Sequence, residues 1–354
     1  MNSNKTKQTS KTITGSVRPV VVITGASVGL GLAIAKQLIS EDKYHLVLTA
    51  RERSLPRFGN EDIQESRHVS IMALDVTNRK QREVLVEKIL WRFGHIDYLI
   101  NNAGVAYRTV VEHIEPYELV RQMAINFYAP LEMIRLVLPN MRSRKKGHII
   151  NISSVSGMMA MPTMGLYSSS KFALEALSEA LWYEVKPWNI KVTLVEPGFI
   201  RSEAFTKVPL SRKAKVVRSN DQCPYNNHYR SMAPFVAKMM GLAFAKPKNV
   251  AKKVSKIMKR KRPPLRQPAT FDAYLFHLLK KVLPSSIYLR LLYWTLPDSK
   301  NWGNEDVVES DFANFILKKN EEAETAVNNL DFVDSKNLPG KKKTATGYKT
   351  KIVN

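Results

Sequence analysis

Ser154, Tyr167 and Lys171 have side chains that together can move a proton to or from a carbonyl or alcohol oxygen. Tyr167 and Lys171 are four residues apart at the start of an apolar-periodic stretch, so they share one face of a predicted helix. A phenol titrates at about pH 10, and a nearby ammonium stabilises its ionised form and lowers its pKa. Ser154 follows an apolar stretch and can hydrogen-bond a substrate oxygen. The three residues predict acid–base catalysis coupled to hydride transfer, although a Tyr-x-x-x-Lys pair by itself is mostly structural.

A glycine-rich stretch near the start of the chain predicts a place for a dinucleotide. Thr24 to Gly31 reads TGASVGLG, follows the apolar run 20–23 and leads into a helical pattern. Glycines let the backbone turn tightly and approach a phosphate, and the unpaired amides at a helix start face the anion. Taken alone, the stretch is also compatible with an ordinary strand–helix turn.

The elements that would position these residues alternate along the chain. Strands are predicted at 20–24, 45–50, 69–73, 96–101, 147–153 and 191–196, and helices at 29–40, 79–93, 116–138, 167–186 and 249–259. Strands that alternate with helices are typical of a doubly wound parallel α/β sheet, the Rossmann fold, which binds ligands at the carboxyl ends of its strands.

The sequence predicts one catalytic domain with extensions at both ends. The dinucleotide-binding domain is expected over 19–265, with a loop-rich substrate insert at 200–250 that contains four prolines. Residues 1–18 are expected to be a disordered basic arm, 266–300 an amphipathic extension, and 301–354 a mostly disordered polar tail with a short helix at 311–319. Charges and Pro284 interrupt the extension too often for a transmembrane span. It is compatible with a helix lying on a membrane, with packing onto the domain, or with contact to a second subunit.

Composition narrows the functional classes. The chain has 354 residues, 44% of them hydrophobic, and a single cysteine, Cys223, which excludes an internal disulfide and a cysteine-based zinc site. Of the net charge of +24, the segment 205–266 carries +16, with 17 Lys or Arg against one acid. This charge predicts attraction of the segment to an anionic membrane or an anionic substrate. The alternative interpretation is a solvated basic face. No nucleic-acid module accompanies it. The first 18 residues lack the apolar stretch of a secretory signal, so a cytoplasmic protein with peripheral membrane association is expected.

The ordered set of motifs resembles the classical short-chain dehydrogenase/reductase family. The resemblance covers about residues 18–265, and the extended C-terminal part is similar to the 17β-hydroxysteroid/retinol dehydrogenase-like subgroup. The motifs that carry it are Thr24–Gly31, Asp75, Asn101–Gly104, Asn126, Ser154, Tyr167, Lys171 and Pro197-Gly198. The chain departs from the family in having Ala129 where many members have Gly, and Ser202 where many have Thr.

The resemblance implies a role for each of these positions. Tyr167 would be the acid/base, Lys171 would lower its pKa and bind the nicotinamide ribose, Ser154 would orient the substrate oxygen, and the backbone of Asn126 would hold a relay water. The cofactor would contact the glycine turn, the ends of the third and fourth strands and the segment after the sixth: Gly25, Ser27, Gly29, Leu30, Gly31, Asp75, Val76, Asn102, Ala103, Gly104, Pro197, Gly198 and Ser202, with Asn101 bracing the sheet. The two long helices at 116–138 and 167–186 would form a homodimer interface.

The end of the second strand predicts which cofactor is used. An acidic residue there would bind both ribose hydroxyls and repel a 2′-phosphate. Ala50 stands at this position and Arg51 follows it, with Arg53 nearby. A guanidinium matches a phosphate in charge and geometry, so NADP(H) is favoured over NAD.

These observations predict an NADP(H)-dependent oxidoreductase that interconverts a ketone or aldehyde with an alcohol on a steroid-, retinoid- or lipid-like substrate. No metal is expected. Met158, Met159, Met161 and Met164 are candidates for an apolar pocket lining, or for loop packing. A non-catalytic dinucleotide-binding sensor or scaffold at membranes is the alternative from another class.

Overall fold

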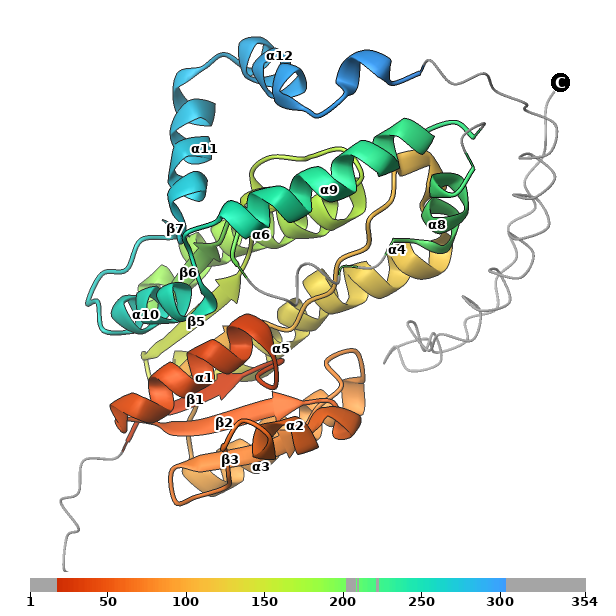
Figure 1. Cartoon of the computed structure of the whole chain (residues 1–354). Helices are drawn as coiled ribbons and strands as arrows, with labels where there is room; N and C mark the ends of the chain where they lie inside the picture. The colour runs from red at the N-terminus through yellow and green to blue at the C-terminus, as the bar shows by residue number, and fades with distance from the viewer. Residues whose placement is uncertain (1–17, 202–207, 209, 221–222, 304–354) are drawn as a thin grey trace, which may run out of the picture.

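Seven parallel strands form one sheet in the order β3-β2-β1-β4-β5-β6-β7, as the computed structural model of residues 18–201, 208, 210–220 and 223–303 shows (Figure 1). The strands are β1 (Val20–Ile23), β2 (His45–Ala50), β3 (Val69–Ala73), β4 (Tyr98–Asn101), β5 (Gly147–Ile152), β6 (Ile190–Glu196) and β7 (Arg266–Pro268). The strand order reverses between β1 and β4, so the crevice at their carboxyl ends is the expected ligand site.

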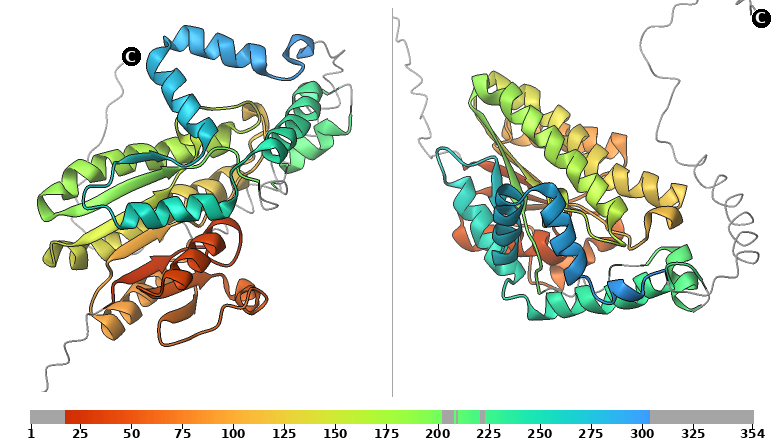
Figure 2. Two further views of the ribbon diagram at one scale, coloured as in Figure 1. Left: turned by 60° about the vertical axis from the view of Figure 1, so that its left-hand side comes forward. Right: turned by 90° about the horizontal axis from the view of Figure 1, so that it is seen from above.

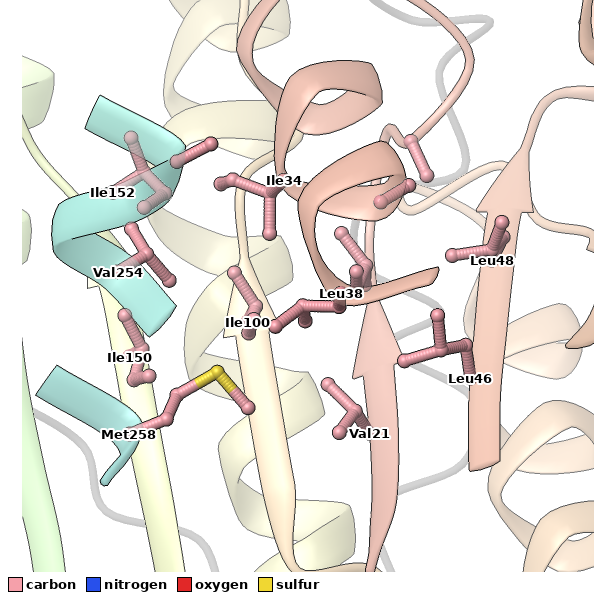
Figure 3. Packing of buried hydrophobic residues seen from close by; sticks show 14 of the residues in the cluster. Val21, Ile34, Leu38, Leu46, Leu48, Ile100, Ile150, Ile152, Val254 and Met258 are labelled. Carbon is pink, nitrogen blue, oxygen red and sulfur yellow. The ribbon is translucent and has the colours of Figure 1, made fainter. Parts of the chain in front are cut away.

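Helices cover both faces of the sheet, because successive strand residues point to opposite sides. Helices α1 (Gly29–Glu41) and α10 (Pro247–Met258) pack on one face, where Ile34, Leu38, Val254 and Met258 meet Val21 and Ile23 of β1 (Figure 3). On the other face, α3 (Arg79–Phe93), α5 (Ala129–Ser143) and α6 (Gly165–Val185) meet Val20 and Val22. Each fully buried aliphatic side chain contributes about 1.5–3 kcal/mol.

The Rossmann fold expected from the sequence is confirmed, and most element bounds agree within two residues. The predicted helix 116–138 is one continuous helical segment with three parts: α4 (Pro116–Met123), a π-helical turn (Ala124–Tyr128) and α5. Strand β7, which pairs with β6, was not expected from the sequence. The sheet therefore continues past residue 265, where the domain was expected to end.

The expectation of an irregular insert at 200–250 is wrong for much of its length. Helices α8 (Arg212–Arg218) and α9 (Asn226–Leu242) lie there, and Pro234 is inside α9. Tyr229 of α9 is fully buried against Val110, Ala214 and Val217, so tertiary packing outweighs the lost helix hydrogen bond at the proline. The short α2 (Pro56–Gly59) follows β2.

The C-terminal extension forms two helices, α11 (Phe271–Val282) and α12 (Ser285–Thr295), which meet at Pro284. Figures 1 and 2 show α11 rising from the end of β7 and α12 turning away from it. Among the described residues, no helix is long and apolar enough to cross a membrane. The predicted arm over 1–17, the tail beyond residue 303 and its helix at 311–319 lie outside the described residues.

Candidate active site

A cavity of about 1000 Å³ opens at the carboxyl ends of the strands. It brings together the glycine turn and the predicted acid–base residues, which are more than 120 positions apart in the chain. The predicted site residues that line it are Gly25, Ser27, Gly29, Leu30, Gly31, Arg51, Asp75, Val76, Asn102, Ala103, Gly104, Ser154, Tyr167, Lys171 and Pro197. Gly198 follows Pro197 of the lining but does not itself line the cavity, Asn126 is fully buried, and Ser202 lies outside the described residues.

The glycine turn needs its glycines for a close backbone approach. Gly25 has a φ of 66°, and a Cβ on it would stand 2.9 Å from the Ala103 Cα. A Cβ on Gly31 would stand 2.3 Å from the Gly25 carbonyl oxygen. Helix α1 begins at Gly29 without a side-chain cap, so its first amides are left for another acceptor. A diphosphate fits this place by charge and by available space.

Thr24 and Asn102 hold the turn against the end of β4. The Thr24 hydroxyl accepts hydrogen bonds from the amides of Asn102 at 3.0 Å and Ala103 at 3.1 Å. The Asn102 side-chain amide donates to the carbonyls of Thr24 and Gly25, both at 3.0 Å. Asn101 donates to the Asn151 side chain of β5 at 2.9 Å. The sequence analysis placed Thr24 in the motif but did not predict that its hydroxyl joins β1 to β4.

Ser154, Tyr167 and Lys171 converge on the cavity wall opposite the turn. Lys171 donates to the Ile152 carbonyl at 2.8 Å, and its Nζ lies 5.8 Å from the centre of the Tyr167 ring. Burial raises the pKa of Tyr167 to about 12 and outweighs the hydrogen bond with Ser154, which lowers it. Burial also lowers the pKa of Lys171 to about 8. The lowering of the Tyr167 pKa expected from the sequence is therefore overcome by burial, and the phenol holds its proton.

Asn126 sits in the π-helical turn between α4 and α5 and is fully buried. Its side chain closes the Gly104 loop, since it accepts from the Val105 amide at 2.9 Å and donates to the Val105 carbonyl at 2.8 Å. It also donates to Ser170 of α6 at 3.0 Å. A π turn shifts the backbone hydrogen bonding of a helix and is common at functional sites. The periodicity of the sequence cannot show such a turn.

Four guanidinium groups line the end of the cavity that holds Asp75. Arg51, Arg53 and Arg57 follow β2, and Arg121 comes from α4 and donates to the Tyr117 hydroxyl. Burial and the charge of Arg53 lower the pKa of Arg51, the nearby Asp75 carboxylate opposes this, and Arg121 and Arg57 lower the pKa further. No ion pair within the described part of the chain neutralises any of the four. Arg57 and Arg121 were not expected at the site from the sequence, because only the fold brings them to this place.

The extension helps to build the site, which the sequence analysis did not predict. The Asp272 carboxylate of α11 accepts from the Phe199 amide at 2.7 Å, and Thr270 accepts from the Gly198 amide at 2.8 Å. A Cβ on Gly198 would stand 1.9 Å from Asp272 Oδ2, so a larger residue here would displace the Asp272 carboxylate. The first turn of α11 therefore fixes the Pro197-Gly198 segment at the edge of the cavity.

The four candidate methionines do not line the described cavity. Met158, Met159 and Met161 instead pack against Phe276 and Leu279 of α11 and Tyr288 of α12. Met164 precedes α6 and bridges to Thr109. The loop-packing alternative thus describes their position. Among the described residues, no His, Cys, Asp and Glu side chains gather in a group that could hold a metal.

Residues 19–213, more than half of the chain, match the family model for short chain dehydrogenase. The chain belongs to this family. It is 35% identical over 278 residues to a 3-ketodihydrosphingosine reductase of Bacteroides thetaiotaomicron, with 77% of this chain and 97% of the relative covered.

Many solved structures share the fold, among them two short-chain oxidoreductases. A short-chain dehydrogenase from Streptomyces avermitilis matches with a TM-score of 0.66 and 28% identity, over 78% of this chain and 96% of the other. A metagenomic short-chain oxidoreductase in complex with NADP matches with a TM-score of 0.54 and 25% identity, over 72% and 98%. Membership of this family supports an oxidoreductase that uses a nicotinamide dinucleotide.

Proposed function

We propose that the protein is an NADP(H)-dependent oxidoreductase that interconverts a ketone or aldehyde with an alcohol on a hydrophobic substrate. The observation that carries this proposal is the convergence of Ser154, Tyr167 and Lys171 on the cavity that also holds the glycine turn. A bound nicotinamide would supply or accept the hydride. In the reducing direction, Ser154 orients the carbonyl oxygen and Tyr167 donates its proton to that oxygen while the adjacent carbon gains the hydride.

Lys171 and Asn126 are proposed to support the proton transfer without donating to the substrate themselves. The ammonium of Lys171 stabilises the phenolate that Tyr167 becomes after it gives up its proton. Gly104 lies beside both groups, because a Cβ on it would stand 3.4 Å from the Asn126 side-chain oxygen and 4.0 Å from Lys171 Nζ. A relay from Asn126 through water to Lys171 would return the proton to Tyr167.

The cluster of guanidinium groups supports NADP(H) as the cofactor. A 2′-phosphate on the adenosine ribose adds negative charge beside Arg51, where Ala50 puts no carboxylate in its way. The solved metagenomic short-chain oxidoreductase in complex with NADP is consistent with this choice.

A hydrophobic substrate is supported by apolar residues of the cavity lining and by one relative. Val105, Ala106, Ile200 and Val208 are among the residues that line the cavity. The relative that shares 35% identity is named a reductase of 3-ketodihydrosphingosine, a lipid-like ketone.

Oxidation of NADPH in the presence of a panel of carbonyl compounds tests the reaction. The panel should include long-chain ketones, steroids and retinoids, with small polar ketones as the matched comparison. We expect turnover with at least one hydrophobic carbonyl. If NADPH binds but no carbonyl in the panel is reduced and no alcohol oxidised, the non-catalytic dinucleotide-binding alternative is favoured.

We also propose that the outer faces of α11 and α12 bind an anionic membrane. Phe271, Leu275, Leu278 and Val282 recur at helical spacing along α11 and are exposed, whereas Phe276 and Leu279 face the domain. On α12, Ile287, Leu291 and Trp294 form a second exposed stripe. Soluble monomers rarely expose so many neighbouring apolar side chains.

Charge favours a lipid surface as the occupant of these stripes. Exposed Lys281 and Arg290 lie on the same two helices, and Lys253 of α10 lies over the Tyr274 ring at 4.8 Å. The acid on α11, Asp272, is already engaged by the Phe199 amide. Apolar stripes edged by cations match the headgroup region of an anionic bilayer.

A homodimer is proposed from the family resemblance, with α4, α5 and α6 at the interface. Tyr128, in the π-helical turn between α4 and α5, and Tyr183 of α6 are exposed aromatic side chains on this surface. Lys280 of α11 lies over the Phe172 ring of α6 at 5.4 Å, so the extension borders the same face. Light scattering at micromolar concentration should give the mass of two chains, and a single-chain mass would contradict the proposal.

A further inference from the structure

Two buried carboxyl groups face each other directly behind the candidate acid–base residues. Glu175 is on α6, one helical turn after Lys171, and Glu196 ends β6, directly before Pro197-Gly198. Glu196 is completely buried and Glu175 is 5% exposed. Arg266 of β7 reaches both, with its Nε 3.2 Å from Glu175 and 3.6 Å from Glu196.

The hydrogen bonding of this pair requires one proton. With both groups ionised, neither oxygen of Glu196 has a donor partner, and two carboxylates would stand against one guanidinium. A proton on Glu196 turns it into the donor of a hydrogen bond to Glu175. Burial and the neighbouring Glu175 accordingly raise the pKa of Glu196 to about 8. Burial raises the pKa of Glu175 as well, but the Arg266 Nε donates to its Oε2 at 3.2 Å and favours the carboxylate form there.

The packing holds Glu175 in this place. A Cβ on Gly157 would stand 2.7 Å from the Ser153 hydroxyl and 2.9 Å from Glu175 Cγ, so a larger residue there would push the Glu175 side chain out of its place. Arg266 also binds Glu179, one turn further along α6, at 2.8 Å. Two groups of α11 complete the charged surroundings: His277 lies near Arg266, and Asp272 is bound to the Phe199 amide.

We propose that Glu175 and Glu196 are positioning residues for the acid–base site, which share one proton so that a single carboxylate, that of Glu175, faces Lys171 and keeps its ammonium charged. The proposal rests on the reaction proposed above. Burial favours the neutral amine of Lys171, and Glu175 is the neighbouring charge that opposes this effect. Glu196 directly precedes Pro197-Gly198, so the Glu175–Glu196 pair links the surroundings of Lys171 to the segment at the cavity edge.

The pH dependence of two variants tests the proposal. Glu175→Gln removes the carboxylate next to Lys171. Glu179→Gln is the matched control, because it removes another carboxylate bound to Arg266 that lies two helical turns from Lys171. We expect the alkaline limb of kcat to move to lower pH in Glu175→Gln, with a loss of roughly tenfold on that limb and KM little changed. Glu179→Gln should follow the wild type. Glu175→Gln/Glu196→Gln should shift in the same direction, which excludes compensation by an ionised Glu196.

A second measurement does not depend on turnover. The rate at which fluorodinitrobenzene labels Lys171, followed by mass spectrometry against pH, reports the neutral amine directly. Faster labelling of Lys171 at neutral pH in Glu175→Gln, without the same change in Glu179→Gln, supports the proposal even if no carbonyl is reduced, in which case only the proposed reaction fails.

The proposal is overturned if the pH profile of kcat and the labelling of Lys171 in Glu175→Gln match those of the wild type, or if Glu175→Gln and Glu179→Gln shift equally. If the wild type is active in that case, the proposed reaction still stands. If Glu175→Gln does not fold cooperatively, Glu175→Asp replaces it. The shorter side chain places the carboxylate farther from Lys171, so we expect the alkaline limb of the pH profile of kcat to shift less, but in the same direction. An unchanged pH profile overturns the proposal.

Discussion

At the scale of single residues, the site depends on what burial does to ionisable groups. Tyr167 and Lys171 are both almost fully buried. Burial raises the pKa of Tyr167 and lowers that of Lys171, and so favours the uncharged form of each. A neutral phenol is the form that can give a proton to a carbonyl oxygen. The hydroxyl of Ser154 and the charge of Lys171 then determine how readily it does so.

Tyr167→Phe should abolish turnover and leave NADPH binding intact. The ring and its packing survive, and only the oxygen that carries the proton is removed. Acid–base assistance is typically worth about 10²–10⁴-fold in rate, so a loss in that range is expected in kcat, with NADPH binding followed by fluorescence. Activity within about tenfold of the wild type would contradict the assignment.

Arg51→Ala should shift cofactor preference from NADPH towards NADH. The guanidinium is expected to bind the 2′-phosphate, which NADH lacks, at a cost of about 1.5–3 kcal/mol for a hydrogen bond to a charged group. The ratio of kcat/KM for the two cofactors is the measurement. Arg67→Ala, at an exposed arginine that does not line the cavity, is the control. An unchanged ratio in Arg51→Ala would mean that another residue reads the phosphate.

At the scale of elements, the inner and outer faces of the extension differ in what they contact. The inner face of α11 fixes the cavity edge through Asp272 and packs on the Met158 loop, where Lys280 also donates to the Met158 carbonyl. The outer face leaves apolar side chains exposed. This division allows the outer face to be changed without disturbing the site.

Leu278→Gln/Val282→Gln should weaken binding to anionic vesicles and leave kcat with a water-soluble carbonyl unchanged. Both side chains are more than half exposed, so little packing is lost. The measurement is co-sedimentation with vesicles of phosphatidylcholine alone or with phosphatidylserine, at low and high salt. Trp91→Gln on α3, which is 88% exposed, is the matched control.

Wild type should bind the anionic vesicles, and salt should weaken the binding. Equal sedimentation of the wild type and the double variant would rule out these stripes as the membrane surface. A loss of dimer mass in the double variant would instead assign them to a subunit contact.

At the scale of the whole molecule, the strands, the extension and the acid–base helix meet at the Glu175–Glu196 pair. Arg266 of β7 joins α6 and β6 there. Folding raises the pKa of Glu196 from 4.5 to about 8, so the native state holds a proton that the unfolded chain releases. The stability linked to this proton is fully present below pH 4.5 and is lost as the pH rises through about 8.

Glu196→Gln should therefore gain stability relative to the wild type as the pH rises. Its neutral amide imitates the protonated carboxyl and can still donate to Glu175, but it does not titrate. The difference in Tm between variant and wild type should grow by several degrees from acidic to alkaline pH, since 1 kcal/mol corresponds to about 2–4 °C in a domain of this size. Glu179→Gln should show a constant difference. A difference for Glu196→Gln that does not change with pH would contradict the shared proton.

The sequence by itself determined the features that depend on local periodicity and on motifs. Apolar strands alternating with amphipathic helices predicted the doubly wound sheet, and the glycine turn with Tyr167 and Lys171 predicted residues that now line one cavity. These features are readable because a strand, a helix start or an i, i+4 pair is written in neighbouring residues.

The tertiary structure alone decided what depends on residues distant in the chain. Only the fold brings Arg121 to Arg51, Asp272 to Phe199, and Glu175 to Glu196 and Arg266. It also makes a strand of Arg266–Pro268 and a helix around Pro234, because pairing with β6 and the burial of Tyr229 outweigh local preference. The raised pKa of Tyr167 has the same origin: desolvation is set by everything packed around the group, and no spacing along the chain records it.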